Sequence, residues 1–163
     1  MGKRFLGVLC LAGLCIMPVW ASTVSFLVIE TGLGEESPAN ESSTLWETAL
    51  MDVFFDTGHI VSNAPVLRLP EKPAQEFPEE ARVDFNEALS GGAEFFIIAL
   101  LDYQGNPQGE RPKPRNVSLR IFRIRPYQVL FKQDYSGGVT VSAEEELAGA
   151  KSVARTITGH LKD

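Results

Sequence analysis

The stretch EFFIIALLDY, residues Glu94 to Tyr103, is the longest apolar run outside the first 20 residues of this 163-residue chain. A strand with one wet face alternates apolar and polar residues, whereas a strand covered on both faces is apolar throughout. The run therefore predicts a central strand with helices packed above and below it. That arrangement is typical of an α/β fold.

A strand and a helix are predicted upstream of this run. Residues 23–30 (TVSFLVIE) are rich in β-branched and aromatic side chains, which favour a strand. Thr44 and Glu47 have the spacing of a capping box, so we expect a helix over residues 44–57. Gly58 follows as the residue that ends this helix.

A short extended piece and a second helix come next. Residues 59–66 predict the extended piece, which ends in a turn, and residues 69–78 contain three prolines and predict a connecting loop. Pro78 suits the first position of a helix because its missing N–H is not needed there. We expect this helix to end at Gly91 and Gly92.

A hairpin and a closing helix follow the central run. Residues 117–124 and 129–135 read as two strands joined by a tight turn. The apolar alternation of the first strand changes phase at Phe122, which indicates a bulge or a sheet edge. Ser142 and Glu145 form a second capping box, and an apolar stripe at helical spacing continues after them.

The predicted order of elements is therefore β-α-β-α-β-β-β-α. It favours an α/β (α+β) sandwich of two or three layers, with a mixed sheet of four to five strands and about three helices. The chain shows no internal repeat and no linker. We expect residues 22–163 to form a single domain.

The first 21 residues have the pattern of a secretory signal peptide. Lys3 and Arg4 precede an uncharged, mostly apolar run, and Val19 and Ala21 place small residues at the −3 and −1 positions of a cleavage point. We predict cleavage after Ala21 and a periplasmic or secreted location. The alternatives are a retained membrane anchor, for which the run is short, and a lipoprotein.

Both cysteines of the chain, Cys10 and Cys15, lie inside this leader. Cys15 would be the acylated residue of a lipoprotein, but Leu14 stands where that pattern needs a small residue. Removing the leader also removes Lys3 and Arg4, which changes the formal charge from −6 to −8. The remaining chain is cysteine-free, which excludes thiol chemistry and disulfide bonds from it.

The residue patterns predict neither a metal site nor a cofactor site. His59 and His160 are about 100 residues apart and match no ligand spacing. The Gly32-Leu33-Gly34 segment follows a strand, but two glutamates come directly after it and would repel a phosphate, so we expect a tight turn. The acidic residues that could form a general acid–base pair are Glu30, Asp102 and Asp134.

The charge distribution departs from that of an ordinary domain. Seven cations and no anion lie between positions 111 and 132. They could pair with acidic helix residues such as Glu144 to Glu146 and keep a sheet edge from pairing with other chains. Alternatively, they could form an anion-binding face together with the proline-rich loop 104–116. The candidate binding residues are Arg111, Lys113, Arg115, Arg120, Arg123, Arg125 and Lys132.

The order of elements and two short motifs resemble the N-terminal domain of TolB. The motifs are Gly58-His59-Ile60-Val61 after the first helix and Gly92-Ala93-Glu94-Phe95-Phe96-Ile97 after the second. The same plan occurs in the LpoB-like activators of penicillin-binding proteins and in the CsgG-like curli secretion family. These families act by binding, so the resemblance implies a non-enzymatic envelope protein with no catalytic residue.

We therefore predict an exported, non-enzymatic binding or accessory module of the bacterial cell envelope. Its expected partner is an envelope protein or an anionic cell-wall polymer, with no nucleic acid, no cofactor and no membrane-spanning segment after the leader is removed. The alternative is a small exported hydrolase that uses the carboxylates named above. A homo-oligomeric assembly is a further possibility.

Overall fold

A computed structural model describes residues 21–33, 40–104, 113–137 and 142–161 of the protein. All of the predicted leader except Ala21 lies outside these ranges. Within them, no helix is long and apolar enough to cross a membrane.

A six-stranded mixed sheet forms the middle of the molecule, with the strand order β2-β1-β4-β5-β6 and with β3 beside β1. Strand β1 runs parallel to β2, β3 and β4, whereas β5 runs antiparallel to both of its neighbours, β4 and β6. The strands are β1 (Thr23–Thr31), β2 (Ile60–Asn63), β3 (Leu67–Leu69), β4 (Phe95–Asp102), β5 (Asn116–Arg123) and β6 (Gln128–Ser136).

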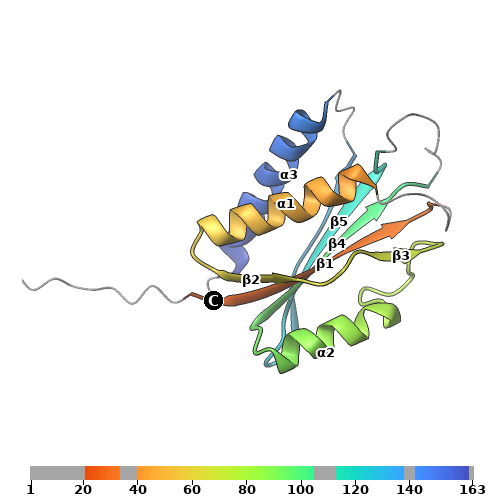
Figure 1. Ribbon diagram of the computed structural model, residues 1–163. Helices are drawn as coiled ribbons and strands as arrows, with labels where there is room; N and C mark the ends of the chain where they lie inside the picture. The colour runs from red at the N-terminus through yellow and green to blue at the C-terminus, as the bar shows by residue number, and fades with distance from the viewer. Residues whose placement is uncertain (1–20, 34–39, 105–112, 138–141, 162–163) are drawn as a thin grey trace, which may run out of the picture.

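Helices cover both faces of this sheet, which gives three layers. Helices α1 (Glu41–Asp56) and α3 (Ala143–Thr158) pack side by side on one face, and α2 (Arg82–Ser90) covers the other face (Figure 1). Two short 3₁₀ helices, Glu79–Ala81 and Gly159–Leu161, precede α2 and follow α3. The predicted fold class is confirmed, and so is the predicted order of elements, to which the structure adds one short strand, β3.

The prediction of a central strand covered on both faces is confirmed by β4. All eight of its residues are buried, and its side chains divide between two apolar clusters. Phe95 and Ile97 point toward α1 and α3, whereas Phe96 and Ile98 point toward α2. The apolar run is continuous because successive residues point to opposite faces of the sheet and both faces are covered by apolar side chains.

Helix α1 begins earlier than the predicted capping box at Thr44 and Glu47. The N-cap residue is Asn40, whose side chain accepts a hydrogen bond of 2.9 Å from the Ser42 amide. The next two serines are buried, and each finds a distant partner for its hydroxyl. Ser42 donates to Glu146 Oε2 at 3.1 Å, and the Ser43 hydroxyl lies 3.3 Å from that of Tyr103. These contacts draw the serines into the helix.

Two further boundaries differ in part from the predictions. Pro78 is the N-cap of the 3₁₀ turn Glu79–Ala81, and α2 begins only at Arg82. Residues 59–66 contribute β2 and lead into a further strand, β3, because both segments pair with β1. The sheet therefore has six strands where four to five were expected.

The hairpin and the second capping box are as predicted. Ser142 and Glu145 exchange hydrogen bonds of 3.2 and 3.3 Å at the start of α3. A register shift lies beside Phe122, but the extra residue is Leu130 in β6. The change of phase in β5 reflects its two covered faces, since Phe122 packs in the α2 cluster and Ile121 in the α1–α3 cluster.

The turn after β1 requires glycine at position 32. Gly32 has φ of +79°, and a Cβ there would lie 2.8 Å from the backbone nitrogen of Gln104. We expect Gly32→Ala to lower the free energy of unfolding by about 1–3 kcal/mol, the range for a non-glycine residue in this conformation. The matched control is Gly149→Ala in the exposed part of α3, which should raise it by up to about 1 kcal/mol. Urea unfolding of both variants tests the difference, and equal effects would contradict it.

The Tyr103 side chain makes stability sensitive to alkaline pH. Burial raises the pKa of its hydroxyl well above 10.0, and the Ser43 hydrogen bond only partly opposes this shift. The neutral tyrosine therefore contributes stability below about pH 10, and this contribution is lost as the pH rises toward the folded-state pKa. We expect Tyr103→Phe to flatten the fall in urea midpoint between about pH 9 and pH 11. An unchanged slope would contradict the prediction.

Candidate binding groove

The predicted basic residues do not form one continuous stripe. Arg120 is 6% exposed, and its side chain reaches across the α2 face of the sheet to the loop before α2. Its Nη1 donates hydrogen bonds to the carbonyl oxygen of Gln75, at 3.0 Å, and to that of Glu76. Arg120 is therefore an internal clamp that holds this loop against the sheet, and it is not available at the surface.

Two other cations of the hairpin also have partners inside the chain. Lys132 Nζ lies 2.7 Å from Glu76 Oε1, and this contact lowers the pKa of the Glu76 carboxyl. Arg123 lies on the opposite face of the sheet, with its guanidinium 5.8 Å from the centre of the Phe95 ring. The partner of Lys132 is thus the clamped loop and not the expected Glu144 to Glu146.

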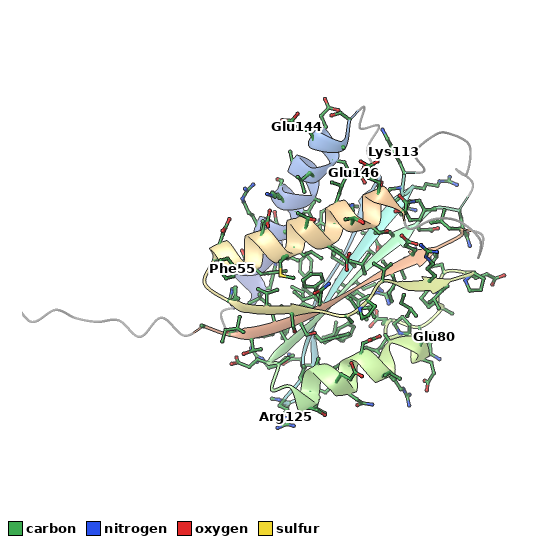
Figure 2. The ribbon with its side chains drawn as sticks, viewed as in Figure 1. Phe55, Glu80, Lys113, Arg125, Glu144 and Glu146 are labelled. Atoms are coloured by element: carbon green, nitrogen blue, oxygen red, sulfur yellow. The ribbon has the colours of Figure 1, made fainter. Side chains whose placement is uncertain are left out.

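The remaining cations are separated along the molecule. Figure 2 shows Lys113 and Arg125 at opposite ends of it. Lys113 lines an apolar cavity of about 220 Å³ where α1 and α3 meet β5 and β6, whereas Arg125 is exposed in the turn of the hairpin beside α2. Arg115 is exposed near the start of β5, and Arg111 lies outside the described residues.

Aromatic side chains gather where the hairpin turn meets α2. The Tyr127 ring stacks on Phe122 with centroids 6.0 Å apart and an interplanar angle of 18°. Phe85 of α2 meets the edge of Tyr127 at 6.1 Å and that of Phe77 at 5.2 Å. Tyr127 nevertheless remains 57% exposed. An exposed ring that is held by other rings has little freedom to lose on binding.

These side chains line an open groove of about 440 Å³, which we call the Tyr127 groove. Its walls combine aromatic rings with one cation and two amides, and among the described residues no carboxylate lines it. Such a mixture of apolar area and a few polar groups is typical of ligand sites. The lining residues are Gln75, Phe77, Arg82, Phe85, Asn86 and Tyr127.

The Arg120 clamp positions one wall of the Tyr127 groove. Phe77 and Gln75 belong to the loop whose carbonyl oxygens Arg120 holds, and the contact between Lys132 and Glu76 fixes the same loop from β6. The sequence predicted Arg120 to be a binding residue, and the groove was not among the predicted sites. Phe77, a large aromatic residue within the proline-rich loop 69–78, was the available signal.

The carboxylates that could have formed an acid–base pair lie apart. Glu30 faces α1 and receives a 3.0 Å hydrogen bond from Arg68 Nε of β3. Asp102 is on the α2 side of the sheet, where it accepts from the Thr31 hydroxyl at 3.4 Å and from the Gln104 amide at 3.0 Å. Asp134 is exposed on β6, two strands from β4.

The two histidines contact aromatic rings. His59 meets the edge of Phe54 at 6.2 Å, and His160 lies 4.4 Å from the Phe131 ring centre. Across the described ranges, no group of histidine, cysteine or acidic side chains could hold a metal ion.

The sequence matches no protein-family model and no curated relative. Among solved structures, the PelC dodecamer from Paraburkholderia phytofirmans is similar at 12% identity and a TM-score of 0.48, with 86% of this chain and 87% of that one covered. Lipoprotein GNA1162 from Neisseria meningitidis is similar at 9% identity and a TM-score of 0.45, with 85% of this chain and 99% of the lipoprotein chain covered. TolB from Acinetobacter baumannii is similar at 10% identity and a TM-score of 0.43, with 87% of this chain and 28% of the TolB chain covered. These values describe a loose resemblance of fold.

The clamp and the surface ion pair should differ in their effect on stability. Arg120→Met leaves two loop carbonyl oxygens without their donor, so we expect the free energy of unfolding to fall by about 1–3 kcal/mol. The matched change Lys132→Met removes only a solvent-exposed pair and should lower the free energy of unfolding clearly less than Arg120→Met does. Chemical denaturation of both variants measures the difference. Equal losses would show that Arg120 is not a clamp.

Proposed function

We propose that this protein is an exported, non-catalytic binding module of the bacterial cell envelope that holds an acidic glycan polymer in the Tyr127 groove. The observation that carries the proposal is the lining of that groove. Of the residues that the structure describes, those in its walls offer aromatic area, an arginine and two amides but no carboxylate, in a chain whose formal charge is −6.

The chemistry of these side chains suits a hydroxylated, acidic ligand. The face of a tyrosine ring packs against the apolar face of a sugar ring, and its hydroxyl is a hydrogen-bond donor and acceptor. Gln75 and Asn86 each offer a donor and an acceptor to hydroxyl groups. Arg82 offers a planar fork that matches a carboxylate. A sugar acid presents all three of these partners at once.

A second arginine lies near the groove. Arg125 is exposed two residues before Tyr127, in the same turn of the hairpin, and Figure 2 shows it beside α2. Arg82 forms an ion pair with Glu79, with Nη2 of the arginine 3.0 Å from Oε2 of the glutamate. Both side chains are 65% exposed, so the carboxylate of a ligand can reach the guanidinium and compete with Glu79. A long acidic polymer would therefore meet both arginines as it crosses the groove.

The alternative of a carboxylate-dependent hydrolase receives less support from the geometry. Such an enzyme needs two carboxyl groups on either side of one scissile bond. Glu30 and Asp102 lie on opposite faces of the sheet, and helices cover both faces. Glu30 is also only 1% exposed, so a polymer has no direct access to it.

The proposal is tested by removing the aromatic wall at its exposed end. We expect Tyr127→Ala to weaken binding of polygalacturonate by up to about tenfold, because ring packing contributes about 0.5–1.5 kcal/mol beyond the buried area. Tyr127→Phe should retain most of the affinity, and neutral dextran should not bind. Isothermal titration calorimetry gives each dissociation constant.

The matched control is another exposed aromatic residue. Phe55 is 71% exposed at the end of α1, on the opposite side of the sheet from α2 (Figure 2). Phe55→Ala should leave the affinity unchanged. If both substitutions weaken binding equally, or if dextran binds as well as the acidic polymer, the groove is not the binding site.

A further inference from the structure

The two edges of the sheet differ in length and exposure. One edge is formed by β2 and β3, which have four and three residues. The other is β6, which has nine residues, six of them exposed. A short or broken edge strand is protected from pairing with other chains, whereas a long one presents a row of free backbone donors and acceptors. Strand β6 is therefore the edge that can accept another strand.

We infer that β6 pairs in an antiparallel manner with β6 of a second copy of this chain, around a two-fold axis that passes through Gln133. The pairing would join two six-stranded sheets into one. Its regular part runs from Phe131 to Ser136, where β6 keeps continuous register with β5. The extra residue Leu130 marks the end of that part.

Symmetry restricts where the axis can lie. Residues that face each other across a strand pair point to the same face of the sheet. A two-fold axis perpendicular to the sheet makes each face of one copy continuous with the same face of the other copy. The axis must therefore lie between one residue and the same residue of the second copy. An axis midway between two successive residues would set residues that point to opposite faces against each other. Within the regular part, the central choices are Lys132, Gln133 and Asp134.

Charge selects among these three positions. An axis at Lys132 would place the two lysines directly opposite each other, and an axis at Asp134 would do the same with the two aspartates. An axis at Gln133 places Lys132 of each copy opposite Asp134 of the other. Opposite charges across a strand pair are stabilising and like charges are destabilising. The two-fold axis generates this pair twice, so the interface contains two Lys132–Asp134 pairs.

The same axis also matches the other face of the strand. It places Phe131 opposite Tyr135 of the second copy, and aromatic pairs across strands are stabilising. Both residues are partly buried against the α1–α3 cluster, so each ring is already held from one side. Lys132 keeps its contact of 2.7 Å with Glu76 in its own chain, which orders its side chain before pairing. A single register of the two strands therefore gives favourable charge pairs on one face of β6 and favourable aromatic pairs on the other.

The test uses charge reversal and its rescue. Asp134→Lys places like charges opposite each other in both symmetric pairs, so we expect the dissociation constant of the dimer to rise by about tenfold or more. Adding Lys132→Asp exchanges the two charges and should restore the constant to within about threefold of the natural chain. Sedimentation velocity over a concentration series, on the protein as its host produces it, measures all three.

A cross-link at the axis gives an independent measurement. Gln133→Cys, with Cys10 and Cys15 replaced by serine, places the two new thiols opposite each other, and they should oxidise to a covalent dimer. Gln128→Cys lies in the same strand away from the axis and should remain uncross-linked. A monomer throughout the series, or unchanged association of Asp134→Lys, would overturn the inference. So would a larger assembly in which position 133 does not cross-link.

Discussion

The burial of β4 on both faces is the constraint from which the rest of the structure follows. Eight consecutive residues are buried, so an apolar layer has to cover each side of the strand. Helices α1 and α3, with sixteen residues each, supply one layer with a broad apolar surface. Helix α2 has nine residues and spans only about 14 Å. An eight-residue strand spans about 26 Å, so the second layer is incomplete without further chain.

The loop before α2 completes that second layer, and this explains the position of Arg120. Phe77 packs against Phe96 of β4, at 6.3 Å, and against Phe122 of β5, at 5.3 Å. A loop held close to a sheet has backbone carbonyl groups that need donors. Arg120 supplies them from β5. The Tyr127 groove lies where this loop, α2 and the hairpin turn meet, so the clamp and the groove have the same origin.

The elements that depend on neighbouring residues were predictable from the sequence, and those that depend on distant partners were not. The central strand, the hairpin and the Ser142 cap rest on patterns within about ten residues. The start of α1 does not, because Ser42 hydrogen-bonds to Glu146, 104 positions away. The prediction that Arg120 lies at the surface was wrong for a related reason. The alternation of residues along β5 predicts the side of the sheet to which Arg120 points, but it does not predict which loop covers that side.

The candidate site was difficult to predict for the same reason. Its residues come from a proline-rich loop, a short helix and a turn, and no motif links them. The segment that attracted attention was the run of seven cations, whose described members are distributed over both faces and both ends of the hairpin. Net charge along the sequence is a poor guide to charge at one surface, because alternate strand residues point to opposite faces.

The groove and the β6 edge lie on one strand hairpin, and this relates the two proposals. A two-fold axis perpendicular to the sheet leaves the α2 layers of both copies on the same side. Each hairpin turn, with Tyr127, then lies at an opposite end of the paired β6 strands, so two grooves face one direction. A polymer long enough to reach both would bind the second groove at a high effective concentration. Modest affinity at one groove, which is all that its open shape and few polar groups supply, would then be sufficient for stable retention of a polymer.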